Sequence, residues 1–419
     1  MSHKQKIKIV QNSLELQLEQ TQGDTDYKIS LLPCVSLSDI KKKVTEYPLK
    51  NELLQNIPFY FLDTATNGLS YIKLEFNIND LNESERLVMP LLGSLLTTVG
   101  TTSLSFIELS KEMSLYTGGI SIYPVANTQL GKKSETFCFM SVVGNAVYRN
   151  TDKLLSITDE ILLHPSFADR KKVLEIVLQM KMDLYERINP SGQSFAIIHA
   201  SRFLSPMNRL NSQWDGIEQL KFLELFLKKL KKNYLKEIKV LEQLCKKIFN
   251  RNRMEIILCS EKSNIQTYKK ILPAWLNKFP VLKIKSNSKI HFLAKTVYEG
   301  CQINTNVAYV ARVIPTVPYT HPDSAPLTVL ARILSSGFTH TEIREKGGAY
   351  GGSASHNALN GQFCFSSYRD PNIFKTMLVY NAAARFVIDG GIIESQVLEG
   401  ILQVFASVDS PHSPGSKAS

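Results

Sequence analysis

The feature that most constrains the fold is an order of elements that the chain uses twice. Residues 95–122 (LLTTVGTTSLSFIELSKEMSLYTGGISI) and 329–355 (VLARILSSGFTHTEIREKGGAYGGSAS) follow one plan. In each, an apolar helix ends at a glycine, a short amphipathic helix with glutamate near its start follows, and a Gly-Gly pair leads into a hairpin. The shared order predicts two copies of one α+β domain, with chance similarity of two helix-turn-strand segments as the alternative.

The other segments set the expected boundaries of these units. Residues 1–29 are predicted to be the end of a helical linker, 30–250 a first α+β unit and 251–419 a second, related unit. Each unit is expected to pack a mostly antiparallel sheet on helices. Residues 58–78 are expected to form a strand, a turn at Asn67 and Gly68 and a second strand, and a strand hairpin is expected around Asn360 and Gly361 in the second unit.

The net charge of +11 is concentrated in one segment. Residues 221–253 carry eleven Lys and Arg against Glu224, Glu237 and Glu242, together with apolar residues at helical spacing. This segment is either the solvated face of long helices or a surface for nucleic acid or anionic lipid. Aromatic residues do not alternate with the lysines, as a base-stacking surface requires, so no nucleic-acid partner is expected. No apolar run is long enough to span a membrane.

The cysteines indicate an intracellular protein. They are scattered and form no C-x-x-C pair, which favours single reduced thiols over a disulfide framework or a zinc ribbon. They are Cys34, Cys138, Cys245, Cys259, Cys301 and Cys364. The N-terminal segment lacks the apolar core of a signal peptide and is a poor transit peptide, so no targeting peptide is visible. Either the protein is cytosolic or the chain does not begin where the natural protein begins.

The histidine spacing argues against a metal site within this chain. A hydrolytic metal site on one helix needs two histidines a turn apart with a glutamate nearby. None of the eight histidines lies three to five residues from another, and neither H-x-x-E-H nor H-E-x-x-H occurs. We therefore expect no metal ligands here, and a site assembled from distant residues is the remaining alternative.

The stretch HTEIREKGGAYGG, His340 to Gly352, holds the best candidates for a binding site. Arg344 offers guanidinium donors and Tyr350 a phenolic O–H, and both suit a substrate carbonyl or the oxyanion that it becomes. If a strand begins at Gly348, Tyr350 shares a face with Gly348 and Gly352, where an extended peptide can approach the backbone closely. In the alternative, Arg344 pairs with a neighbouring glutamate, Glu342 or Glu345, and Tyr350 fills a gap in the core.

The same stretch, followed by FSSYRDPN, resembles the C-terminal half of the presequence protease subfamily. These proteins are zinc metallopeptidases of the pitrilysin/insulinase type. LTTVGTTSLSFIELSKEMSLYTGGIS resembles the third domain of that family. RVIPTVPYTHPDSAPLTVLARIL resembles the region just before the arginine, and VFASVDSPHSPGSK resembles a segment after it.

The resemblance implies four related α+β domains in two halves that close around a peptide chamber. The N-terminal half would hold zinc in an inverted H-x-x-E-H helix and supply a glutamate as the general base. Arg344 and Tyr350 would contact the scissile carbonyl and stabilise the oxyanion, and Gly347, Gly348 and Gly351 would line the substrate. The implied substrates are short unstructured peptides such as mitochondrial presequences. The implied partner is the N-terminal half, and the implied compartment is the mitochondrial matrix.

Two departures from the family pattern limit these expectations. The zinc-bearing half has no counterpart in this chain, so zinc is expected only in the complete enzyme and this chain alone is expected to be inactive. The chain ends with VDSPHSPGSKAS, so its second, fourth-domain-like unit is expected to be truncated. One alternative is a non-catalytic superfamily member that acts as a structural subunit or peptide-binding scaffold. Another is a basic binder of nucleic acid or membrane surfaces that uses residues 221–253.

Overall fold

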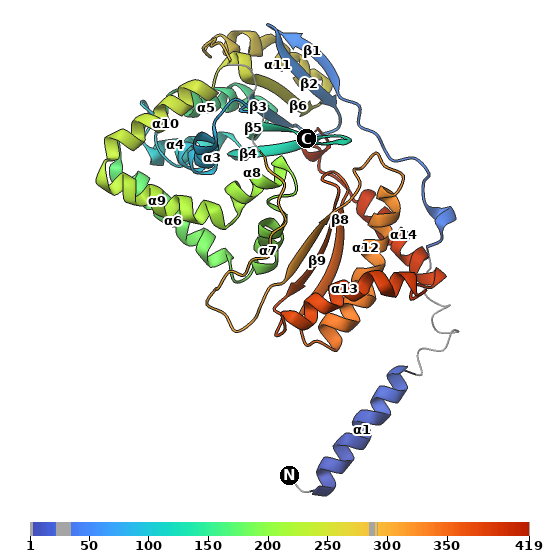
Figure 1. Cartoon of the computed structure of the whole chain (residues 1–419). Coiled ribbons are helices and arrows are strands. Elements are labelled where there is room, and N and C mark those ends of the chain that lie inside the picture. Colours follow the sequence, from blue (N-terminus) through green and yellow to red (C-terminus); the bar gives the residue numbers. More distant parts are fainter. Residues whose placement is uncertain (1–2, 22–34, 285–289, 291, 419) are drawn as a thin grey trace.

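The computed structural model describes residues 3–21, 35–284, 290 and 292–418. Two α+β units, each with its own sheet, make up the main body, and helix α1 (His3–Thr21) lies at the N-terminal end (Figure 1). The two related units of the predicted α+β fold are therefore present. The expected boundary between residues 29 and 30 lies outside the described residues.

The first sheet has six strands in the order β1-β2-β6-β3-β5-β4. Neighbouring strands are antiparallel except β2 and β6, which run parallel. The strands are β1 (Lys50–Leu54), β2 (Ile57–Asp63), β3 (Leu69–Asn77), β4 (Ile120–Gln129), β5 (Lys132–Val147) and β6 (Met254–Ser260). Mostly antiparallel pairing agrees with the expected fold class.

The turn at Asn67 and Gly68 forms, but the strands that it joins are not paired with each other. Both residues have positive φ, 52° and 79°, as a tight turn requires. However, β6 lies between β2 and β3 and pairs with both. The expected strand, turn and second strand are therefore present, but a strand from much later in the chain lies between the two.

The position of β6 also shows that the expected boundary between the units, at residues 250 and 251, is too early in the chain. Residues 251–419 were expected to form the second unit, yet β6 lies inside the first sheet. Helix α11 (Lys262–Leu276) follows β6 and packs on the same sheet, and its Tyr268, Leu272 and Trp275 belong to the first hydrophobic core. The first unit thus includes β6 and α11.

A buried ion pair fixes β6 against the rest of the first sheet. Arg253, directly before β6, donates two hydrogen bonds to Asp80 at 2.5 and 2.6 Å and a third to the Asn77 carbonyl at 2.7 Å. The two side chains are only 3% and 4% exposed. Burial works to raise the pKa of the Asp80 carboxyl, but the Arg253 guanidinium outweighs it and holds that pKa below its usual range. The pair therefore joins the start of β6 to the end of β3.

Helices surround the first sheet and bury its large core. α3 and α8 pack on β4, α5 packs on β5, and α6, α9 and α10 form an outer layer. The helices of this unit are α3 (Glu83–Leu96), α4 (Phe106–Tyr116), α5 (Thr151–Leu163), α6 (Arg170–Arg187), α7 (Gly192–Ser201), α8 (Pro206–Asp215), α9 (Ile217–Lys232) and α10 (Tyr234–Ile248). Short 3-10 turns are η1 (Leu37–Asp39), η2 (Tyr148–Asn150) and η3 (Arg251–Arg253). Among the described helices, none combines the length and apolar character that a bilayer-spanning segment needs.

The second unit is built on three antiparallel strands in the order β7-β9-β8. They are β7 (Ala311–Pro315), β8 (Gly351–Asn357) and β9 (Gln362–Tyr368). The expected hairpin at Asn360 and Gly361 joins β8 and β9. The other elements are α12 (Ser324–Ser336), the π-helical turn η4 (His340–Glu345), α13 (Phe374–Ile388) and α14 (Glu394–Val408). The C-terminal turn η5 (Ser416–Ala418) lies against β6 of the first sheet instead. The helix-glycine-helix-glycine-hairpin plan of the first unit is therefore repeated here.

The small second sheet is covered on both faces, which explains why β9 is almost entirely buried. α12 packs on β8, and Phe363 and Phe365 of β9 share a core with Tyr380 of α13. On the other face lies α7 of the first unit, whose Gln193 donates to Ser366 Oγ at 2.8 Å and to Ser353 Oγ at 3.2 Å. These contacts link the two units.

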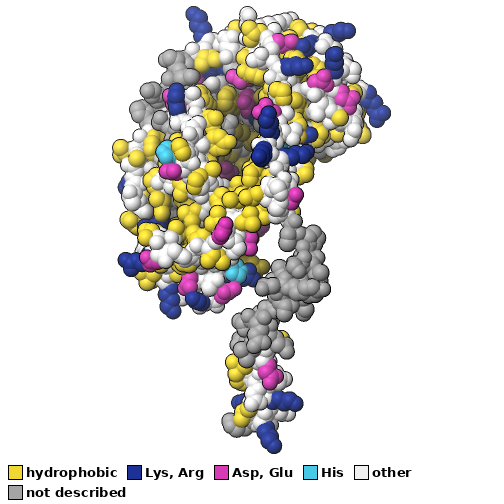
Figure 2. All heavy atoms as spheres, turned by 90° about the vertical axis from the view of Figure 1, so that its right-hand side faces the viewer, with side chains coloured by type: hydrophobic (Ala, Val, Ile, Leu, Met, Phe, Trp, Pro, Cys, Tyr) yellow, Lys and Arg dark blue, Asp and Glu magenta, His cyan; other side chains and the backbone are white. Residues whose placement is uncertain are grey.

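One helical surface of the second unit remains apolar and exposed. Figure 2 faces the side of α12 and α14 and shows hydrophobic side chains gathered across this part of the molecule. Exposed residues of α14 and its start include Ile393, Val397, Leu398 and Val408. The opposite side of α14, with Gly400, packs closely on Val329 and Ile333 of α12.

We predict that Arg253→Met lowers the free energy of unfolding by about 3–5 kcal/mol, because it leaves the Asp80 carboxylate buried without a partner. Urea denaturation followed by circular dichroism measures this change.

Because the pKa of Asp80 is lowered in the folded state, the pair stabilises fully above pH ~4 and its contribution fades as the pH falls through the folded-state pKa.

Lys132→Met is the matched control, because Lys132 and Glu135 form an ion pair that is about half exposed. Its effect should stay below about 1 kcal/mol. Equal losses in both variants would show that the Arg253 pair has no special part in holding β6.

Candidate functional site

The HTEIRE segment forms one turn of π-helix, η4, directly after α12 and a break at Gly337. Its backbone bond from Lys346 N–H to the Thr341 carbonyl, 3.0 Å long, has the wide i to i+5 spacing of that helix type. Ile343 is buried at 1% exposure and anchors the turn in the second core. Arg344, the next residue, lies on the exposed side. Wide turns of this kind occur often at functional sites.

Two glycines let the chain leave η4 tightly. A Cβ on Gly347 would lie 2.5 Å from the Ile343 carbonyl oxygen, so only glycine fits. Gly348 has φ +76°, in the left-handed region that favours glycine, and its N–H donates to the Arg344 carbonyl at 2.9 Å. This exit brings Tyr350 back beside Arg344.

Neither glutamate near Arg344 pairs with it. Glu342 binds Lys346 at 2.6 Å, and Glu345 lies 3.3 Å from His340 Nδ1. Within the described part of the chain, no ion pair or side-chain hydrogen bond of Arg344 is found. Its guanidinium carbon instead lies 5.8 Å from the centre of the Tyr350 ring. The pairing that the sequence left open as an alternative is therefore not formed.

Tyr350 lies at the open end of the β8-β9 hairpin, opposite its turn, and does not fill a gap in the core. Its side chain is 66% exposed. Its N–H donates to the Tyr368 carbonyl at 3.1 Å, and the two rings meet edge to face with centroids 5.7 Å apart. Arg344 and Tyr350 thus lie side by side at the surface, with polar groups available to a ligand.

Two tyrosines beside Tyr350 were not recognised from the sequence. Tyr309 contacts Tyr368, with ring centroids 5.6 Å apart, and Tyr368 O–H donates to the Pro190 carbonyl at 3.2 Å. Tyr309 O–H donates to the neighbouring Asn189 carbonyl. These tyrosines connect the site to the first unit just before α7. The turn predicted at Asn360 and Gly361 could have located Tyr368, because pairing the two strands outward from that turn brings Tyr368 opposite Gly351.

The glycines around Tyr350 differ in their surroundings. A Cβ on Gly351 would meet no atom within 4 Å, and one on Gly348 would meet only Pro371 at 3.8 Å. In contrast, a Cβ on Gly352 would lie 2.6 Å from Ile343 Cβ and 2.8 Å from the Thr339 carbonyl oxygen. The expectation that Gly352 and Tyr350 share an open face is therefore wrong, because η4 covers Gly352. The strand begins at Gly351, so the condition under which Tyr350 would share a face with Gly348 and Gly352, a strand start at Gly348, is not met.

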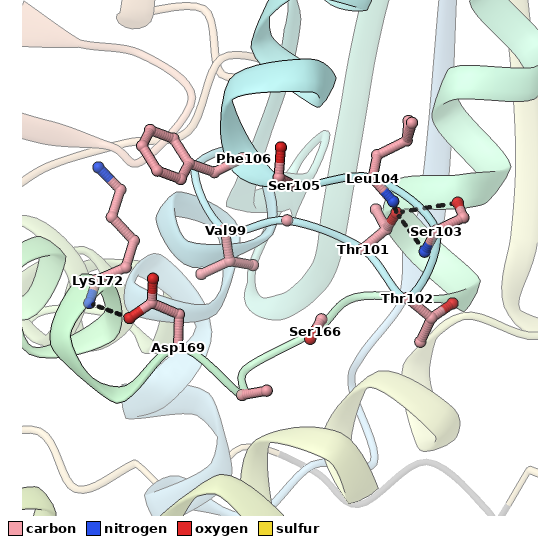
Figure 3. A pocket seen from close by; sticks show the side chains of 12 residues that line it. Val99, Thr101, Thr102, Ser103, Leu104, Ser105, Phe106, Ser166, Asp169 and Lys172 are labelled. Atoms are coloured by element: carbon pink, nitrogen blue, oxygen red, sulfur yellow. Dashed lines mark hydrogen bonds between the residues drawn. The ribbon is translucent and has the colours of Figure 1, made fainter.

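A separate cavity of about 320 Å³ lies in the first unit, at the loop between α3 and α4 and the start of α6 (Figure 3). Two of its polar side chains cap helices: Ser105 accepts from Glu108 N–H at the start of α4, and Asp169 accepts from Lys172 N–H at the start of α6. Lys172 Nζ lies 4.2 Å from the centre of the Phe106 ring. None of its lining residues belongs to the η4–β8 region.

The described residues do not fit a zinc site. No three His, Cys, Asp or Glu side chains among them are grouped so that they would hold a metal ion. His199 lies 2.8 Å from Glu299, and His356 lies 2.9 Å from the Thr328 hydroxyl. No step of the chemistry is therefore assigned to a metal held by these residues.

The described cysteines are free thiols, four buried and one exposed. Burial raises the pKa of Cys138, Cys245 and Cys364 to about 12 and that of Cys259 to about 11. These four thiols stay protonated at neutral pH and act as small core residues. Cys34 lies outside the described residues.

The fold belongs to the class seen in M16-type peptidases. A conserved protein from Enterococcus faecalis matches 86% of this chain and 86% of its own with a TM-score of 0.59 at 14% identity. A peptidase M16 inactive domain from Pseudomonas fluorescens matches 88% of this chain and 86% of its own with a TM-score of 0.56 at 12% identity. These similarities concern the fold alone.

The chain belongs to the family described as associated with M16 peptidases of subfamily C, whose model matches residues 1–226. The PreP C-terminal domain matches residues 300–419. The resemblance to presequence proteases that the GGAYGG stretch suggested is therefore confirmed.

Several curated relatives are named as mitochondrial presequence proteases. The proteins from Danio rerio and Xenopus laevis are 27% and 28% identical over 96% and 100% of this chain. That from Saccharomyces cerevisiae is 28% identical over 95% of the chain. The matches cover 41%, 43% and 41% of those relatives, so this chain spans less than half of their length. Together with the PreP C-terminal match, they place it in the C-terminal part of such proteins.

We predict that Gly352→Ala destabilises the second unit by about 1–3 kcal/mol, because the added methyl group overlaps Ile343 and the Thr339 carbonyl. Gly351→Ala, one residue earlier, meets open space and should change stability by less than about 0.5 kcal/mol. Thermal denaturation of the two variants measures this difference. If Gly352→Ala is as stable as the wild type, η4 does not pack on β8 as described.

Proposed function

We propose that this chain forms the C-terminal half of a presequence-protease-like metalloendopeptidase that degrades short unstructured peptides. In this proposal the chain supplies one wall of the peptide chamber and binds the scissile carbonyl through Arg344 and Tyr350. The complete enzyme acts on peptides such as mitochondrial presequences, in the mitochondrial matrix, as the names of the relatives suggest.

The observation that carries the proposal is the uncompensated guanidinium of Arg344 beside the exposed Tyr350 phenol. Glu342 binds Lys346 and Glu345 lies against His340, so neither carboxylate competes with a ligand for Arg344. Tyr350 lies at the open end of the β8-β9 hairpin, directly before Gly351. A Cβ on Gly351 would meet no atom within 4 Å, so the backbone of a ligand has room there. An extended peptide is a ligand that suits two hydrogen-bond donors beside bare backbone.

These donors would act by stabilising negative charge on the substrate oxygen. Arg344 donates N–H bonds and Tyr350 an O–H bond to the carbonyl oxygen of the bond to be cut. As the carbonyl carbon becomes tetrahedral, its oxygen gains negative charge, and the same donors hold it more strongly. The rings of Tyr350 and Tyr368 and the anchor Ile343 hold the donors in place before the substrate arrives.

The proposal assigns zinc to the N-terminal half of the complete enzyme. In the proposal this half contributes the substrate contacts, and the described residues here offer no group of side chains that would hold a metal ion. The same contacts would serve a non-catalytic peptide-binding scaffold, which is the alternative that the experiment below separates.

Arg344→Ala and Tyr350→Phe, made in the enzyme that contains both halves, should each lower kcat by about 100- to 1000-fold, because each removes one donor to the oxyanion. Cleavage of a quenched fluorescent peptide measures the rate, and elemental analysis measures zinc. Zinc content should equal that of the wild type in both variants.

Arg332→Ala and Tyr319→Phe are matched controls, because both residues are exposed in the same unit and lie outside η4 and β8. They should retain wild-type rates. The proposed roles would be refuted by zinc loss in the Arg344 or Tyr350 variant, or by unchanged kcat. The scaffold alternative predicts peptide binding without cleavage even with both halves present. Chelator-sensitive cleavage by this chain alone would reveal a metal site here.

A further inference from the structure

The end of α9 and the start of α10 form a strongly basic corner, here called the α9–α10 corner (residues 228–239). No acidic residue occurs from Lys228 to Lys236, and Glu237 is the only one in the corner. Its lysines are Lys228, Lys229, Lys231, Lys232, Lys236 and Lys239. All six are exposed. Four of them lie at the end of α9 and two at the start of α10, so positive charge is concentrated where the two helices meet.

This charge is not neutralised by the rest of the described protein. Within that part, none of the six lysines forms an ion pair, whereas Lys181 and Lys247 on neighbouring helix surfaces bind Glu224 and Glu85. Arg170 of α6 adds a further cation, since it donates to the Lys231 carbonyl at 3.3 Å and lies 5.6 Å from the centre of the Tyr234 ring. The corner is therefore ready to attract a polyanionic partner.

An exposed leucine lies in the middle of these lysines. Leu235, in the first turn of α10, is 80% exposed. Tyr234, the preceding residue, donates its O–H to the Phe167 carbonyl at 2.6 Å, and Ile238, one turn later, is buried in the first core. The helix start is thus fixed while Leu235 remains in solvent, which makes Leu235 available to an apolar environment.

We propose that the α9–α10 corner docks on an anionic phospholipid bilayer. Lysines attract acidic headgroups, and a leucine between them can enter the boundary between headgroups and acyl chains. Nucleic acid would satisfy the lysines but offers nothing for Leu235, and no aromatic side chain of the corner is arranged for base stacking: Tyr234 is bonded to Phe167. The combination of charge and exposed leucine therefore favours lipid.

Docking at this corner leaves the candidate peptide site open. In Figure 1, α9 and α10 lie at one margin of the first unit, and α12 and α14 lie on the other side of the molecule. Arg344 and Tyr350 follow α12 and precede β8. The inference is independent of the proposed peptidase function, and either can fail without the other.

Flotation with vesicles of phosphatidylcholine alone, or of phosphatidylcholine with phosphatidylglycerol, tests the proposal on the full 419-residue chain. The wild type should bind only the anionic vesicles, less strongly as salt is raised. The triple change Lys231→Glu, Lys232→Glu and Lys236→Glu should weaken binding by more than about 100-fold. Leu235→Ser, which keeps every charge, should weaken it by about tenfold.

The matched control changes three other exposed lysines, Lys41, Lys42 and Lys43, to glutamate; they are remote in sequence from the corner. It makes the same change in net charge and should bind anionic vesicles like the wild type. Equal loss in this control, absence of wild-type binding, or full binding by Leu235→Ser would overturn the proposal. If the chain binds duplex DNA tightly but binds no vesicles, and Leu235→Ser leaves the affinity for DNA unchanged, the corner is a nucleic-acid site instead.

Discussion

The close packing of Ile343 against Gly352 is the contact on which the candidate site depends. Gly352 has no side chain, so the buried Ile343 reaches the start of β8 and holds η4 against the sheet. The residue after this anchor, Arg344, is thereby placed at the surface, and the Gly347-Gly348 exit returns the chain to Tyr350. A methyl group at position 352 would push η4, which carries Arg344, away from the start of β8, which directly follows Tyr350.

The site is also joined to the first unit through aromatic side chains. Tyr350, Tyr368 and Tyr309 contact one another in sequence, and the last two donate to carbonyl groups just before α7. Because α7 covers one face of the small sheet, the position of the candidate site depends on both units. Arg253 has a comparable effect in the first unit, where its bond to Asp80 holds β6 among strands from much earlier in the chain.

Local sequence patterns predicted many elements but not the non-local pairing. Apolar spacing and the glycines that end the helices located α3 and α4, and Asn360 with Gly361 located the β8-β9 hairpin. The Asn67 turn was also found, but nothing local shows that β6 enters beside it. Arg344 and Tyr350 were selected from the glycines around them, and the structure brings them together. The π-helical turn and the packing of Ile343 and the Thr339 carbonyl against Gly352 could not be predicted, because the spacing of residues in the sequence does not show these contacts.

The most direct test of the account observes Arg344 itself while a peptide binds. The side-chain Nε–H resonance of Arg344, assigned through Arg344→Lys, can be followed by NMR during titration with a short unstructured peptide. The account predicts a saturable shift of this resonance and none for Arg332, on the exposed surface of α12. Saturation of the chain with peptide while the Arg344 resonance stays unchanged would contradict the claim that this guanidinium contacts the substrate.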